Sequence, residues 1–129
     1  MRFVRSVLIA AAVALFAVPA FAAAAVPFDQ NLFAAAQKSG QPILVDIRAS
    51  WCPTCAAQKP ILDSLEAKPE FKNLIVFEVD FDAQKDVVRA FKAQMQSTLI
   101  AFKGAAETGR SVGDTDPKSI EQLLRSTEG

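Results

Sequence analysis

The segment Trp51-Cys52-Pro53-Thr54-Cys55 constrains this chain more than any other, because it holds both cysteines two residues apart. It follows an apolar run over residues 42–47 that is typical of a buried strand, and a helical pattern begins within it. The two cysteines are therefore predicted to lie where a strand passes into a helix, close enough to form and break a disulfide.

The start of a helix favours a thiolate. Unpaired backbone N–H groups and the positive end of the helix dipole lower the pKa of a thiol placed there. Pro53 suits the first helical turn, because its missing N–H would have no partner at that position. We therefore predict Cys52 to be the nucleophile.

The first residues have the pattern of an export signal. Arg2 and Arg5 precede an apolar run over residues 7–18, and Ala20-Phe21-Ala22 fits a small-x-small cleavage site. This predicts a signal peptide over residues 1–22, a domain over residues 23–129 and a periplasmic location. Cleavage after Ala24 is a second option.

An uncleaved membrane anchor is the alternative for this segment. Residues 7–26 carry no charge or hydroxyl group over about the length that spans a bilayer. Pro19 and the many alanines weaken this alternative, because alanine favours a bilayer core only slightly. In both cases the domain is expected outside the cytoplasm.

Charge argues against a nucleic-acid partner. The chain has 14 basic and 14 acidic residues. Without Arg2 and Arg5, 12 basic residues remain against 14 acidic ones, a net charge of −2. The domain has no basic block long enough to follow a phosphate backbone.

Paired cysteines in an exported protein are often a structural disulfide. A bridge between Cys52 and Cys55 spans only two residues, so it constrains the unfolded chain little. Cys-x-x-Cys also begins zinc sites, but two cysteines and no histidine supply four ligands only across a dimer. We therefore expect a redox pair with no metal or other cofactor, and keep a structural bridge and a zinc site as alternatives.

Periodicity and capping residues predict the remaining elements and a single α/β domain. The expected architecture is a mixed central sheet of about four strands flanked by helices. The elements are a helix over 30–39 after Asp29 and before Gly40, a strand over 43–47, a helix from about Cys52 with Pro60 in its interior, a strand over 74–81, a helix over 86–94, a strand over 98–103, a hairpin over 104–112 into a further strand, and a helix from Asp116-Pro117.

Several spacings together resemble the thioredoxin family over nearly all of the predicted domain. Trp51 directly precedes Cys-x-x-Cys, Asp46 lies six residues before Cys52, and Pro60 lies five residues after Cys55. The segment Ser97-Thr98-Leu99-Ile100 is similar to the family's strand beside the active site. The resemblance implies the thioredoxin fold, with both cysteines at its exposed edge.

The resemblance also implies a mechanism. The Cys52 thiolate attacks a substrate disulfide, Cys55 resolves the mixed disulfide, and Asp46 accepts the proton of Cys55 through a water, with a pKa raised by burial. An ordinary strand-end aspartate in water is the alternative for Asp46. The residues expected to contact substrate are Trp51, Pro53, Thr54, Gln96, Ser97 and Thr98.

Three positions depart from the common pattern of the family. Arg48 stands where many members have tryptophan; pairing with Asp46, stabilising a thiolate and lying in solvent are all open. Glu78 stands where some members have lysine. Ser97 stands where the family has a cis-proline; a cis bond before a non-proline residue costs about 3–4 kcal/mol, so we expect a trans Gln96–Ser97 bond and a different loop shape.

The leading functional expectation is an exported reductase of protein disulfides in the bacterial cell envelope. Strong oxidants of this superfamily often carry histidine between the cysteines, whereas this chain has Pro53-Thr54 there and no histidine. The expected partners are disulfide-bearing proteins as substrates and a membrane thiol reductase as electron donor, with the protein itself a monomer. A binding or chaperone module with idle thiols is the alternative.

Overall fold

The structure is a computed structural model that describes residue 14 and residues 24–129. The predicted signal peptide, residues 1–22, lies outside the described residues except for Ala14, and so does Ala23. The elements are β1 (Ala24–Pro27), α1 (Gln30–Lys38), β2 (Pro42–Arg48), α2 (Pro53–Glu66), a 3-10 turn η1 (Pro69–Phe71), β3 (Ile75–Asp80), α3 (Lys85–Ala90), β4 (Thr98–Lys103), β5 (Ala106–Val112) and α4 (Pro117–Arg125).

The strands form one mixed sheet in the order β1-β3-β2-β4-β5. β1 and β2 both pair with β3 in parallel, whereas β2 pairs with β4, and β4 with β5, in antiparallel fashion. The predicted α/β class and mixed sheet are confirmed. The described residues form five strands and not about four, because no strand was predicted over β1, Ala24–Pro27.

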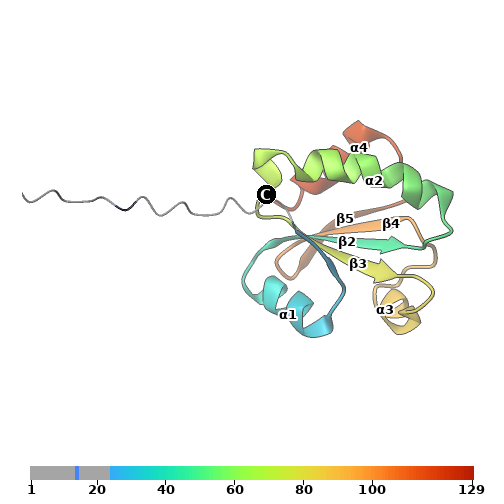
Figure 1. The fold of residues 1–129 in the computed structure, drawn as a ribbon. Coiled ribbons are helices and arrows are strands. Elements are labelled where there is room, and N and C mark those ends of the chain that lie inside the picture. The colour runs from blue at the N-terminus through green and yellow to red at the C-terminus, as the bar shows by residue number, and fades with distance from the viewer. Residues whose placement is uncertain (1–13, 15–23) are drawn as a thin grey trace, which may run out of the picture.

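Helices cover both faces of this sheet. Figure 1 shows α1 and α3 on one face and α2 and α4 on the other. Side chains alternate along β2, so Ile43, Val45 and Ile47 face the α1 and α3 side, while Leu44 faces the α2 and α4 side. Asp46 has the parity of Leu44, which places it on the α2 side, the side of the helix that carries Cys55.

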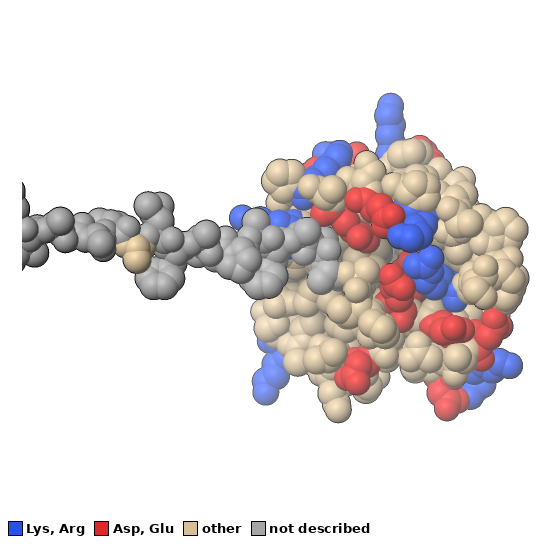
Figure 2. All heavy atoms as spheres, in the orientation of Figure 1, with Lys and Arg blue, Asp and Glu red and all other residues tan. Residues whose placement is uncertain are grey.

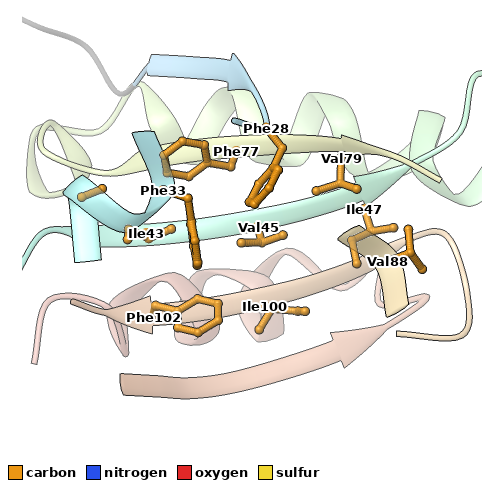
Figure 3. Close-up of a cluster of buried hydrophobic side chains, with 11 residues drawn as sticks. Phe28, Phe33, Ile43, Val45, Ile47, Phe77, Val79, Val88, Ile100 and Phe102 are labelled. Atoms are coloured by element: carbon orange, nitrogen blue, oxygen red, sulfur yellow. The ribbon is translucent and has the colours of Figure 1, made fainter. Parts of the chain in front are cut away.

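Phenylalanines dominate the core on the α1 and α3 side (Figure 3). Phe33 lies at their centre, with its ring centroid 5.4 Å from those of Phe28 and Phe91 and 5.5 Å from those of Phe77 and Phe102. The opposite face has an aliphatic core with one aromatic ring, made of Leu44, Leu62, Leu65, Phe71, Leu74, Val76, Leu99, Ile120 and Leu124. Cys52 stands at the start of α2, the helix whose Leu62 and Leu65 pack into this second core.

Local capping explains where the helices begin and end. Asp29 caps α1 through its Oδ1, which accepts the N–H of Leu32 at 2.9 Å, and Gly40 with φ +74 ends the helix as expected. The helix predicted over 86–94 ends earlier, at Ala90. Lys92 adopts φ 54, and the Ala93 N–H bonds back to the Val88 carbonyl, which closes the helix in a Schellman motif.

Among the described residues, no helix combines the length and apolar character that crossing a bilayer requires.

Candidate redox site

Cys52 caps the N-terminus of α2. Its backbone is extended, with φ −87 and ψ 110, and its Sγ accepts the N–H of Cys55 at 3.1 Å. Pro53 occupies the first turn, where it has no N–H to leave unpaired. One backbone donor of the helix start thus points at the Cys52 sulfur, an arrangement that favours a thiolate there.

A disulfide joins Cys52 to Cys55 in this structure. The two cysteines lie beyond the end of β2, and they pack with Ala49 and Phe81. The family resemblance implied an exposed pair, but only 3% of Cys52 and 4% of Cys55 is exposed. Between the two buried cysteines, Pro53 is exposed and Thr54 is partly buried.

Trp51 is 57% exposed beside this disulfide. Its indole Nε1 donates to Oδ2 of Asp82 at 2.6 Å. Asp82 lies in the turn after β3, where its own N–H donates to Asp80 Oδ1 at 2.9 Å. The sequence offered no signal for Asp82, because its role depends on a contact between segments 31 residues apart.

Asp46 lies in β2 with only 6% of its surface exposed. Burial raises its pKa from 3.8 to about 6; the Arg48 charge opposes this rise, the Glu78 charge adds to it and the Lys59 charge opposes it. A cavity of about 50 Å³ is lined by Asp46 and Cys55 together. The structure thus places Asp46 and the Cys55 end of the disulfide on one cavity, and a cavity of this size has room for a water.

Arg48 pairs with Glu78 and not with Asp46. Its Nη1 lies 3.4 Å from Oε2 of Glu78. Glu78 is the β3 partner of Asp46 in the parallel register, so the guanidinium of Arg48 meets a carboxylate on the neighbouring strand. The expected alternative of a direct Arg48–Asp46 pair is therefore wrong.

Glu66 is a further acid in this cavity that sequence reasoning missed. Partial burial raises its pKa to about 7, with further contributions from the nearby charges of Asp63, Asp46 and Glu78. It stands at the C-terminal end of α2, eleven residues after Cys55 on the same face. A carboxyl group with that pKa can gain or lose a proton near neutral pH.

The segment before β4 holds the remaining predicted contact residues. The Gln96–Ser97 bond is trans, because no described peptide bond is cis, and Ser97 adopts φ 58. Ser97 and Thr98 are buried, Gln96 is partly buried, and Thr98 pairs with Ile47 of β2. This segment therefore lies beside the strand that leads to the cysteines.

Gln58 connects this segment to α2, and sequence reasoning did not identify it. Its Nε2 donates to the Ser97 carbonyl at 3.3 Å. The available signal was its position: Gln58 lies three residues after Cys55 in a helical stripe that is otherwise apolar.

The surface of the domain carries charges of both signs (Figure 2). Figure 2 shows acidic and basic side chains next to one another on the face in view, without a broad field of one sign. Within residue 14 and residues 24–129, no three His, Cys, Asp or Glu side chains are grouped so that they could hold a metal ion.

Comparisons with known proteins agree with one another. Residues 23–126 match the family model described as Thioredoxin. The thioredoxin of Chlamydia muridarum is 36% identical over 96 residues, which are 74% of this chain and 91% of that protein. The bifunctional thioredoxin reductase/thioredoxin of Mycobacterium leprae is 33% identical over 97 residues, 75% of this chain and 20% of that protein.

Among solved structures, Trxlp from Edwardsiella tarda EIB202 is 40% identical with a TM-score of 0.76, covering 78% of this chain and 98% of that one. The range matched by the family model contains Cys52, Cys55, Asp46 and Ser97.

Proposed function

The chain belongs to the thioredoxin family, and from this premise we propose that it is an exported reductase of protein disulfides in the bacterial cell envelope. One observation carries the redox part of the proposal. The Cys52 sulfur caps α2 and bonds to Cys55, and Cys55 lines a cavity together with the buried Asp46. Because both cysteines are in the disulfide, the structure represents the oxidised end of the proposed cycle.

The reduced protein begins the reaction with a Cys52 thiolate. It attacks one sulfur of a substrate disulfide, forming a Cys52–substrate bond while the other substrate sulfur leaves and takes up a proton. The Cys55 thiolate then attacks the Cys52 sulfur, forming the observed disulfide and releasing the second substrate thiol. The substrate gains two electrons, which the protein loses, and two protons, of which Cys55 gives up one and solvent supplies the other.

Asp46 is the proposed base for Cys55. A carboxyl with a pKa of about 6 is mostly ionised at pH 7, so it can accept a proton, and it is a stronger base than an ordinary carboxylate. Both properties suit proton exchange with a nearby thiol. The cavity shared by Asp46 and Cys55 supports transfer through a water. Asp46 is therefore expected to act on release of the mixed disulfide more than on its formation.

Electrons must return to the protein after each cycle. The Mycobacterium leprae relative is named as a thioredoxin reductase joined to a thioredoxin, which supports a dedicated reductase as donor. Outside the cytoplasm we propose a membrane thiol reductase in that role. It would reduce the Cys52–Cys55 disulfide by dithiol exchange with a monomer of this protein.

Reduction of insulin with dithiothreitol as donor tests the activity. The wild-type protein should accelerate reduction, Cys52→Ser should abolish the acceleration, and Cys55→Ser should accumulate mixed disulfides through Cys52 that mass spectrometry identifies. A wild-type protein that fails to accelerate the reaction would leave the binding or chaperone alternative. Alkylation of Cys55 before Cys52 near pH 7 would reverse the assigned roles.

Export is tested separately in the native host. Intact-mass measurement should find a soluble chain that begins near Ala23. Recovery of the full-length chain only from membranes would favour the anchor, and recovery from the cytoplasm would refute the proposed location without touching the redox chemistry.

A further inference from the structure

A glutamine lies inside the buried stripe of α2. The buried residues of this helix are Cys55, Gln58, Leu62 and Leu65, and only 1% of Gln58 is exposed. An amide in such surroundings is costly unless its polar atoms find partners. The contacts of Gln58 therefore indicate what it stabilises.

The Gln58 amide joins two backbone segments that are distant in sequence. Its Nε2 donates to the carbonyl of Ser97 at 3.3 Å and to that of Asp114 at 2.9 Å. Ser97 directly precedes β4, and Asp114 follows β5. The Gly113 N–H also donates to the Ser97 carbonyl, at 2.9 Å. One donor from α2 and one from the end of the hairpin thus hold the same oxygen.

The Ser97 backbone needs this support. Its φ of 58 lies in the left-handed region, which residues with a Cβ seldom adopt. The Ser97 hydroxyl donates to the Gln96 carbonyl at 2.5 Å, and Thr98 Oγ1 donates to the Met95 carbonyl at 2.6 Å. These bonds stay within the segment, so they shape it without attaching it to α2. The Gln58 amide provides that attachment.

The other half of the amide has no comparable contact. Among the described residues, Oε1 of Gln58 is buried without a hydrogen-bond partner. The nitrogen must face Ser97 and Asp114, because both of those contacts are carbonyl oxygens. An apolar side chain would avoid the unpaired oxygen but would remove a donor from both carbonyls. The two segments, and not packing in α2, explain the glutamine.

We propose that Gln58 is a positioning residue that holds segments 96–98 and 113–114 in the shape that binds a protein substrate beside Cys52. The proposal rests on the proposed reductase function. An extended polypeptide is the expected ligand, because the first residue of β4, Thr98, pairs with the last residue of β5, Val112, and both segments lie at this end of the sheet. Exposed Met95 and Val112, each at least half exposed, flank the two segments and offer apolar contacts to such a chain.

Gln58 bonds to the backbone of the two proposed binding segments and not to either cysteine. Replacing it should therefore weaken the binding of protein substrates and leave the reactivity of the thiols unchanged. Gln58→Leu removes both donors at similar size. The KM for insulin, with dithiothreitol as donor, should rise about fivefold to tenfold with little change in kcat. The reduced variant should react with the small disulfide dithiobis(nitrobenzoate) within about twofold of the wild-type rate, since that reagent needs no groove.

Two matched variants separate positioning from general destabilisation. Phe33→Leu, in the core on the opposite face of the sheet, should leave the KM for insulin unchanged. Ser97→Gly tests the left-handed backbone directly, because glycine adopts φ 58 without a Cβ clash. The double variant Gln58→Leu with Ser97→Gly should reverse at least half of the rise in KM for insulin that Gln58→Leu causes alone.

The outcomes are distinct. An unchanged KM in Gln58→Leu, or equal losses with insulin and with the small disulfide, overturns the inference and leaves the proposed function standing. A wild-type protein that reacts with the small disulfide but does not reduce insulin refutes both. If circular dichroism shows that Gln58→Leu is unfolded, Gln58→Met replaces it, and the same KM comparison decides.

Discussion

Asp46→Asn tests how much the ionised form of the buried Asp46 carboxyl lowers the free energy of unfolding. The folded protein holds the proton of Asp46 more tightly than the unfolded chain, because burial raises its pKa from 3.8 to about 6. Below pH 3.8 the group is protonated in both states and costs nothing. Between pH 3.8 and about 6 the unfolded chain ionises Asp46 while the folded protein keeps it protonated, so the free energy of unfolding falls by about 3 kcal/mol in total and then levels off. Only 6% of Asp46 is exposed, so solvent screening reduces this figure little.

Asparagine cannot ionise, so the variant escapes this loss. The free energy of unfolding of Asp46→Asn, relative to wild type, should be about 2 kcal/mol higher at pH 8 than at pH 4.5. At pH 4.5 the wild-type protein has already lost about 1 of the 3 kcal/mol. A fixed cost of burying the amide shifts both values equally and cancels from that comparison. The change corresponds to a movement of the urea midpoint, relative to wild type, of roughly 1 to 2 M.

Urea titrations of the oxidised protein, followed by far-ultraviolet circular dichroism, provide the measurement. Asp86→Asn is the matched control, because its side chain is 92% exposed; its difference from wild type should stay within about 0.5 kcal/mol at both pH values. If the advantage of Asp46→Asn is the same at pH 4.5 and pH 8, the folded protein does not resist the charge, and the argument for Asp46 as a base loses its physical support.

Three further changes test other parts of the structure. Glu66→Gln should gain stability relative to wild type as the pH rises from 4.5 to about 7 and keep that gain above pH 7, because a pKa raised from 4.5 to about 7 means that ionised Glu66 is disfavoured in the fold; urea titrations at pH 4 and pH 8 that show the same difference from wild type would contradict this. Phe33→Ala should lower the free energy of unfolding by about 3–5 kcal/mol, since it opens a cavity among four packed rings, and a loss below about 1 kcal/mol would mean that the cluster repacks. Gly104→Ala should cost more than Gly113→Ala in thermal unfolding: both have positive φ, but an added Cβ at Gly104 meets the Gly40 Cα at 3.1 Å, whereas at Gly113 it meets nothing within 4 Å. Equal losses in the two variants would show that the close approach carries no cost.

Features with a local cause could be predicted from the sequence. Asp29 and Gly40 bound α1 as expected, and Asp116 caps α4 through its side chain, because each acts on backbone groups a few residues away. The early end of α3 had no such signal, since Lys92 takes the left-handed position that glycine usually marks. β1 was missed for a different reason: Ala-Ala-Val-Pro has little strand character of its own, and its pairing with β3 is non-local.

The same division holds at the candidate site. Cys52 and Cys55 were predicted from their spacing at a strand-to-helix junction and Asp46 from the family resemblance, and their catalytic roles stay predictions. Glu78 became the partner of Arg48 only through the register between β2 and β3. Gln58 acts through contacts 39 and 56 residues away, a relation that spacing along the chain does not contain.

The position of Trp51 also determines what the intrinsic fluorescence of this protein reports. The chain has one tryptophan and no tyrosine, so essentially all emission excited near 295 nm comes from a half-exposed indole beside the Cys52–Cys55 disulfide. Disulfides quench excited indoles by accepting an electron, so reduction of Cys52–Cys55 should raise the fluorescence intensity. A bound substrate should shift the wavelength of the emission maximum. The phenylalanine core, on the far face of the sheet, stays nearly dark in such an experiment. Fluorescence of the unlabelled protein is therefore a gauge of redox state and of docking, and a poor one of unfolding.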